Sequence, residues 1–513
     1  MAESAVGAAG LALAVPGVID VLIRYGAWIG QRIDSFQNAK GVWADLGEFG
    51  WSLSRGELNV IILAAKSFYL EEGCDLGLKN SLKLQIGKLK ADVDATKAFL
   101  EQQNPKNIFA RTIFAISGER RAKELNRTLA LDKQSLAQIL TINDIRTRRT
   151  AEPLLLAKKR FSVYQNCAYK LVQGSKNLFI AQGDYSQDPL EVAYEEVKVL
   201  VERPSSDTFV SEVNLKDIAG FLSYRLSQKG VLTRAESSNR GLLRCLGYRM
   251  EPSPELVFAL PQSTRQPQTL RNLIASKHAH PLDFRFQLAR KLSEAVLEVA
   301  AARLVHKSIR TETILIVEPT GLAEGTANDH FRGFGDVFLT TWSLLRDVSG
   351  QTLHTGGSQW AENLYRHPKR QGLDVQERYN MGHDIYSLGV CLLEIGLWEL
   401  LFDTDDAVGQ PRLSEVFRNA AGVSNGTIPT TEAELNAKLR RPSEIKTILL
   451  SLAEDVLPQR VGLRYQRLVT ACLTALDQPS GLGPEIDFAK MSEVDRGVAF
   501  RDHILSFLTE MSI

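Results

Sequence analysis

Cysteine is scarce in this sequence, and its five cysteines stand singly, with no CxxC pair. A zinc site or redox couple built on paired cysteines is therefore not predicted, and this usage indicates a reducing, intracellular compartment. An excess of one charge is also missing: the formal net charge of +1 gives no global reason to expect nucleic acid. With 44% hydrophobic and 24% charged residues, the chain lacks the signature of disorder. We expect a cytoplasmic, folded chain of two or three domains.

A long uninterrupted apolar run is absent as well. Residues 5–19 are apolar, but no positive charge precedes them, and the pattern continues past Asp20 and Arg24 with helical spacing. These features argue against a signal peptide. The run is also shorter than the roughly 20 apolar residues that a membrane-spanning helix needs.

From residue 1 to about 165, apolar residues recur at steps of three and four, most clearly over 78–93 and 119–142. This spacing is typical of amphipathic helices that pack on one another. No alternating strand pattern occurs before residue 165, so we predict an α-helical bundle.

The pattern changes near residue 170. Strands are predicted at residues 176–180, 196–202, 247–250 and 255–260, and helices at residues 214–228 and 283–302. After Pro261 the chain is mainly helical. Strands followed by helices predict a two-lobed α+β domain, and the whole chain is expected to be a multidomain α and α+β protein.

Three segments of the second part have a common resemblance. Residues 304–315, LVHKSIRTETIL, follow the long helix and place His306 early in the segment. YRHP occupies 365–368, and the DIYSLG segment from Asp384 to Gly389 begins an apolar helix. In order and spacing these segments resemble the catalytic loop, the end of the activation segment and the large buried helix of protein kinases. The resemblance implies a two-lobed kinase fold in which Asp384 braces the catalytic-loop backbone.

The residues that phosphoryl transfer needs are missing from these positions. In kinases a catalytic-loop aspartate, an asparagine and the DFG aspartate supply the base and the magnesium ligands. Here hydroxyl side chains replace the first two, and no carboxylate stands at the DFG position. The degenerate catalytic loop contains His306, Ser308, Arg310 and Thr313, and the degenerate DFG segment is Thr341, Trp342 and Ser343. A GxGxxG loop is also absent. The resemblance therefore implies a pseudokinase that needs no metal or cofactor.

Two possibilities for residual chemistry stay open. ATP binding without turnover would use Lys198 on the strand at 196–202, although a lysine on a strand is usually solvated. Arg203 is the weaker alternative. Asp336 lies close to the DFG position and could act as a displaced metal ligand, but the preceding Gly333-Phe-Gly335 favours a turn.

The N-terminal helix has a resemblance of its own. The segments GLALAVPG at 10–17 and IDVLI at 19–23 resemble the first helix of fungal HeLo and HeLo-like domains, and the whole order is similar to the mixed-lineage kinase domain-like family. That resemblance implies a helix that leaves the bundle and enters membrane when triggered. A buried first helix of an ordinary bundle is the alternative. The residues that would meet lipid are Leu11, Leu13, Val15, Val18, Ile19, Leu22 and Ile23.

Residues 105–165 carry 13 lysine and arginine residues against 5 acidic ones. Such a segment attracts anionic lipid, at about 1 kcal/mol per charge near the surface. A solvated face paired with acidic residues is the alternative, and no fold motif supports nucleic acid. The predicted lipid contacts are Arg120, Arg121, Arg146, Arg148, Arg149, Lys158, Lys159 and Arg160.

We therefore expect a pseudokinase that restrains a membrane-active helical effector in regulated cell death or incompatibility signalling. Its partners would be anionic lipids, an upstream protein trigger and further copies of itself, with recruitment to the plasma membrane on activation. A signalling scaffold without membrane insertion and a residual kinase are the alternatives. The predicted divisions are a HeLo-like bundle at 1–104, a basic helical brace at 105–168, a pseudokinase at 169–478 with lobes at 169–260 and 262–478, and a helical extension at 479–513.

Overall fold

The computed structural model describes residues 76–102, parts of 18–25, 62–69 and 121–140, and most of 161–511. Apart from a few single or paired positions, the parts of 161–511 that are not described are 164–169, 186–194, 205–214, 223–240, 262–265, 319–334, 343–345, 348–359, 372–378, 405–410 and 423–440.

The chain divides into two compact units. The first is Met1–Thr150 with Lys229–Arg234, and the second is Ala151–Gln228 with Ala235–Ser512. The division falls inside the stretch 105–168 that the sequence presents as one basic brace.

The first unit is helical in the residues described. Its longest element, α4 (Leu76–Gln102), buries one stripe of leucine, isoleucine and valine side chains, as its apolar spacing predicts. Lys97 Nζ lies 4.3 Å from the centre of the Tyr25 ring, which places the helical residues of 18–25 beside α4. On another side, Gln85 Nε2 donates to Asp132 Oδ1 over 2.8 Å and joins α4 to the helical residues of 121–140.

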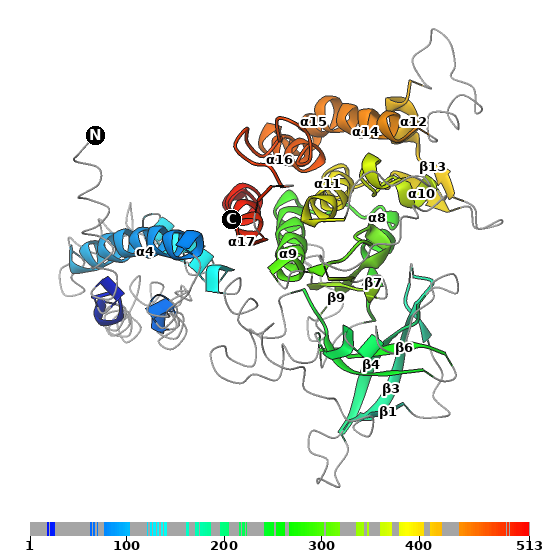
Figure 1. Ribbon diagram of the computed structural model, residues 1–513, viewed down its shortest axis with the longest axis horizontal. Coiled ribbons are helices and arrows are strands. Elements are labelled where there is room, and N and C mark those ends of the chain that lie inside the picture. Colours follow the sequence, from blue (N-terminus) through cyan, green and yellow to red (C-terminus); the bar gives the residue numbers. More distant parts are fainter. Residues whose placement is uncertain are drawn as a thin grey trace. The chain divides into compact units, whose positions relative to one another are not determined.

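The second unit begins with a six-stranded antiparallel sheet in the order β1-β3-β4-β6-β5, with β2 also paired to β3 (Figure 1). Alternation along the strands sends one set of side chains into a core of Ala181, Val199, Val201, Leu246 and Val257. The strands are β1 (Phe161–Val163), β2 (Lys170–Leu171), β3 (Leu178–Tyr185), β4 (Glu195–Glu202), β5 (Arg244–Arg249) and β6 (Glu255–Ala259).

In its remaining described residues this unit is mainly helical, with three small antiparallel sheets. The helices are α8 (Leu270–Ala275), α9 (Leu282–Ala301), α10 (Trp360–Asn363), α11 (Met381–Leu397), α12 (Glu415–Ala420), α14 (Pro442–Ser451), α15 (Leu457–Val461), α16 (Leu463–Leu473), α17 (Glu493–Phe500) and α18 (Ser506–Met511). The short strands are β7 (Gln268–Thr269), β8 (Leu304–Val305), β9 (Ile314–Val317), β10 (Asp336–Leu339), β11 (Arg346–Asp347), β12 (Phe402–Thr404) and β13 (Pro411–Leu413).

Helix α11 lies at the centre of the helical part, and every one of its residues is buried. It packs between α9 and α16 (Figure 1). A Cβ added at Gly389 would come within 2.8 Å of Cys472 Cβ on α16, so only glycine allows this approach. The N-cap residue Asn380 accepts a hydrogen bond from Gly382 N over 2.8 Å and starts the helix.

The predicted elements of the second unit are confirmed in outline. The expected strands correspond to β3, β4, β5 and β6, the long helix corresponds to α9, and the described residues between 215 and 222 are helical. The protein is a mixed α and antiparallel β structure, as expected. The prediction that no strand precedes residue 165 is wrong, because Phe161–Val163 forms β1. Three residues are too few to show a period, and only pairing with β3 creates this strand.

Candidate functional site

A tight backbone turn follows β8 and carries the sequence that resembles a catalytic loop. Lys307 has a φ of 65°, a left-handed conformation that is costly for a residue with a Cβ. A short 3-10 helix, Thr311–Thr313, then leads into β9, which pairs with β10. The end of β10 is tied back to this helix, because the backbone N–H of Thr340 donates to the carbonyl oxygen of Thr313 over 2.9 Å.

The side chain of Asp384 on α11 accepts hydrogen bonds from the backbone of this turn. Its Oδ2 accepts from His306 N over 2.8 Å, and its Oδ1 accepts from Lys307 N over 3.0 Å and from Tyr379 Oη over 2.8 Å. Burial raises the pKa of Asp384 to about 6, against the lowering effect of the hydrogen bonds it accepts. The carboxylate thus fixes two successive backbone N–H groups, one of them at the left-handed residue.

His306 and the hydroxyl residues of the turn are turned inward. His306 is fully buried, its ring lies edge-on to Trp342 with centroids 4.8 Å apart, and burial lowers its pKa to about 3, so the imidazole is neutral. Thr313 Oγ1 donates to the carbonyl oxygen of Ser308 over 2.6 Å and accepts from Arg310 N over 3.2 Å. The Thr313 hydroxyl therefore hydrogen-bonds within the turn, and its side chain has no carboxylate or carboxamide oxygen that could bind a metal ion.

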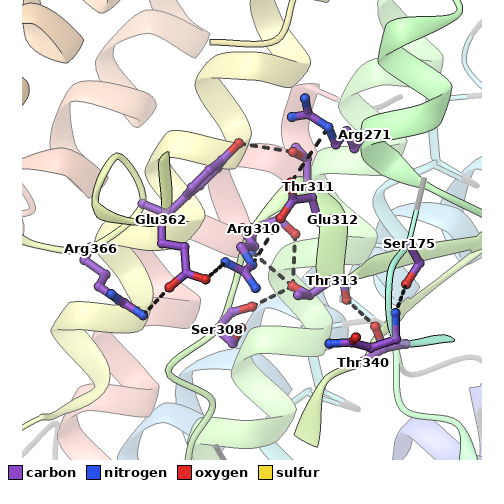
Figure 2. A network of polar contacts seen from close by, with 12 residues as sticks. Ser175, Arg271, Ser308, Arg310, Thr311, Glu312, Thr313, Thr340, Glu362 and Arg366 are labelled. Atoms are coloured by element: carbon purple, nitrogen blue, oxygen red, sulfur yellow. Dashed lines mark hydrogen bonds and ion pairs between the residues drawn. The ribbon is translucent and has the colours of Figure 1, made fainter. Parts of the chain in front are cut away.

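A chain of alternating charges runs beside the turn (Figure 2). Arg310 Nη1 lies 3.0 Å from Glu362 Oε1, and Arg366 Nη2 lies 2.7 Å from the other oxygen of the same carboxylate. Arg310 Nε also lies 3.5 Å from Glu312, which in turn lies 3.8 Å from Arg271. Burial alone would raise the pKa of Glu362, but Arg310 and Arg366 hold it below its ordinary value. Glu362 thus joins α10 to the turn through Arg310, and Arg366 holds the same carboxylate from the residues that follow α10.

A second buried carboxyl group supports the same region. Glu394 on α11 is fully buried, and it accepts from Tyr365 Oη over 2.7 Å and from Leu401 N over 2.8 Å. Burial raises the pKa of Glu394 to about 7. The Tyr365 hydroxyl also lies 3.1 Å from Thr311 Oγ1, so α11 reaches the turn a second time.

Glu202 joins the six-stranded sheet to the segment that follows β10. Its side chain is 1% exposed, and its two oxygens accept from Thr341 N over 2.8 Å and from Trp342 N over 2.6 Å. Thr341 has a φ of 70°, which is unusual for a β-branched residue. We call these two hydrogen bonds the Glu202 clamp.

The other predicted site residues of the second unit lie apart from this turn. Lys198 is exposed on β4, and its phosphate-binding role stays a prediction. Asp336 begins β10 at the end away from Thr341, and its Oδ1 lies 3.3 Å from Lys291 Nζ. Gly389 lies inside α11, and Ser343 lies outside the described residues.

The predicted membrane residues lie in the first unit. Ile19 and Leu22 are fully buried, and Val18 and Ile23 are half-buried. Leu11, Leu13 and Val15 lie outside the described residues. Among the described residues, none of the helices combines the length and hydropathy that crossing a membrane requires.

Of the predicted lipid-contacting charges, Arg121 is exposed, and its Nη1 lies 2.7 Å from Glu124 Oε2. The remaining residues of that set lie outside the described residues; they are Arg120, Arg146, Arg148, Arg149, Lys158, Lys159 and Arg160.

Sequence reasoning missed Glu202 and Glu362. Glu202 could not have been found from the period of β4, because Lys198, Leu200 and Glu202 share one face and only the last two are buried. Glu362 has a local signal in its four-residue spacing to Arg366, but no local signal indicates its contact with Arg310 in the turn.

At the positions that the resemblance to protein kinases assigns to the metal ligands, the residues present do not fit a magnesium–nucleotide complex. Ser308, Thr313 and Thr341 carry hydroxyl groups where kinases place oxygen ligands from carboxylates or a carboxamide. Within the part of the chain that the structure describes, histidine, cysteine and acidic side chains form no group of three that could hold a metal ion. Comparison with protein-family models and with curated proteins finds no match to this chain.

Proposed function

We propose that this protein is a catalytically inactive, kinase-like regulator that restrains a helical effector acting on membranes. The observation that supports the kinase-like part is the Asp384 contact, in which a buried carboxylate binds the backbone N–H groups of His306 and Lys307. This is the contact that the resemblance to a kinase catalytic loop implies. Strands followed by helices within one compact unit agree with the same resemblance.

The same turn supports the absence of catalysis. Phosphoryl transfer depends on placing positive charge and a base around the phosphate. At the catalytic position Ser308 offers a hydroxyl, and the hydroxyl of Thr313 is already hydrogen-bonded within the loop. Arg310 is held by Glu312 and Glu362. These contacts fix the conformation of the turn and leave no base or metal ligand at the catalytic position, which suits a regulatory domain.

The first unit supports the effector part of the proposal. Ile19 and Leu22 have no exposed surface, so in the resting protein this helix keeps its apolar side away from solvent. Its apolar residues would be available to lipid only after the helix leaves α4. Anionic lipids, an upstream protein trigger and self-association are the partners that this proposal requires.

The inactivity is tested by incubating the full chain with labelled ATP and Mg²⁺ or Mn²⁺. We expect no transfer to the chain or to a generic substrate, and no difference between the parent and Asp336→Asn. Transfer that depends on Asp336 would show a residual kinase.

The membrane activity is tested by dye leakage from vesicles that contain phosphatidylserine. We expect little leakage from the resting chain and more from Asp384→Ala, because that change loosens the regulatory unit. Adding Ile19→Asp should abolish the gain, whereas the matched change Leu84→Asp should not, since Leu84 is 63% exposed on α4. Leakage that is indifferent to Ile19→Asp would contradict the proposal. Self-association without leakage would favour a signalling scaffold instead.

A further inference from the structure

The Glu202 clamp joins two parts of the second unit that are far apart in sequence. Glu202 ends β4 in the six-stranded sheet, and Thr341 and Trp342 follow β10, 139 and 140 residues later. Trp342 packs against His306 in the turn that Asp384 holds. The clamp therefore connects the sheet to the candidate site itself.

Both oxygens of the Glu202 side chain are used by this contact, one by each backbone N–H. Hydrogen bonds from N–H groups to a carboxylate are among the strong ones, and they gain further when water is excluded. The side chain is 1% exposed, so water does not compete effectively here.

The backbone at Thr341 gives independent evidence that this contact constrains the chain. A β-branched residue with a φ of 70° is strained and persists only where its surroundings determine the conformation. The Glu202 clamp holds the N–H groups on both sides of that strained residue. The strain and the hydrogen bonds point to one fixed arrangement of the segment after β10.

We infer that Glu202 is a built-in anion that positions Thr341 and Trp342 and makes the kinase-like unit independent of nucleotide. The inference rests on the proposed function, because the Thr341 position corresponds to the start of the DFG segment that meets the phosphates and their metal in a kinase. The carboxylate replaces a nucleotide as the group that joins sheet and helical part. It also disfavours phosphate in the same place, since like charges brought together out of water repel.

The lysine candidate on the same strand offers a matched control. Lys198 lies on the same face of β4 as Glu202 but is exposed. Changing Lys198 to alanine removes a charge from β4 and leaves the clamp intact. Changing Glu202 to glutamine keeps the size, removes the charge and leaves one oxygen to accept a hydrogen bond.

Hydrogen exchange of the full chain, followed by mass spectrometry, tests the clamp. In Glu202→Gln we expect exchange of the peptide around 341–342 to become roughly tenfold faster or more, with no change in Lys198→Ala. Glu202→Ala should accelerate it further, and added acetate should slow it again by restoring an anion. Unchanged exchange in Glu202→Gln would overturn the inference even if the chain lacks kinase activity.

Nucleotide independence is tested on the parent chain with millimolar ATP, ADP and their magnesium complexes. We expect no shift of the unfolding temperature and no heat of binding. Saturable ATP binding would overturn the inference while leaving an inactive regulator intact, whereas phosphoryl transfer would overturn the proposed function. The two failures are therefore distinguishable.

Discussion

Replacing Asp384 by alanine tests the contact on which the kinase-like interpretation depends. The change deletes the acceptor for three donors, His306 N, Lys307 N and Tyr379 Oη. A buried donor left without a partner costs about 1–3 kcal/mol, so for three donors we expect a loss of roughly 3–9 kcal/mol in the free energy of unfolding. Against a typical stability of about 5–15 kcal/mol, that loss would bring the second unit close to unfolding.

Asparagine at the same position should cost less. Its oxygen can still accept from Lys307 and Tyr379, but its amide group then faces His306 N, which is itself a donor. One donor is left unsatisfied, so the expected loss is about 1–3 kcal/mol. Tyr379→Phe removes one hydrogen bond without stranding a backbone donor and should cost about 1 kcal/mol.

Urea unfolding at about pH 8 measures these losses, because Asp384 is then ionised. Hydrogen exchange of the peptide around 304–313 shows whether the loss is centred on the turn. Asp283→Ala is the control, since Asp283 is exposed on α9 and its loss should stay within about 0.5 kcal/mol. A loss below about 1 kcal/mol for Asp384→Ala would refute the reasoning, because the donors would then have other partners.

Further predictions concern glycine, pH and strain. Gly389→Ala should lower the free energy of unfolding by about 1–3 kcal/mol, because the added Cβ collides with α16. Gly87→Ala should raise it by about 0.5–1 kcal/mol, because a Cβ at Gly87 has no other atom within 4 Å; urea unfolding measures both changes. Burial and the neighbouring Asp92 raise the pKa of Asp132 to about 7, so the folded protein binds the proton where the unfolded chain has lost it. Stability of the first unit should therefore fall as the pH rises from about 4 to about 7, and Asp132→Asn should remove this slope in pH-dependent melting. Thr341→Gly should keep the stability within about 1 kcal/mol of the parent, because relief of the left-handed strain offsets the added freedom of the unfolded chain; a larger loss would show that the Thr341 side chain matters.

Much of the secondary structure could be predicted because it depends on local periodicity. The apolar stripe of 78–93 became α4, and the alternation of 196–202 became most of β4. The near-continuous apolar run after Asp384 predicted a buried helix, and α11 is buried along its whole length. Strand β1 could not be predicted, since three residues form a strand only when β3 lies beside them.

The candidate site depended much more on contacts between distant segments. The sequence supplied the identities of Ser308, Thr313 and Thr341, and hence the missing carboxylates, without any structure. It suggested Lys198 as a nucleotide-binding candidate on β4, and only the tertiary structure shows that Glu202 is buried on the same strand. Which charge on a strand is buried depends on what packs over that face, and here the covering segment comes from residues 341–342.

By itself the sequence determined most of the longer helices and strands and which chemical groups the turn at 306–313 lacks, because periodicity and side-chain identity are properties of neighbouring residues. Only the tertiary structure decided which carboxyl groups hold the backbone. Asp384 accepts from backbone N–H groups 78 and 77 residues away in the sequence, and Glu362 pairs with Arg310, 52 residues away. Glu202 accepts from N–H groups 139 and 140 residues away, in the segment after β10. Hydrogen bonds of this kind depend on positions to within a few tenths of an ångström, which the chain reaches only after its core has packed.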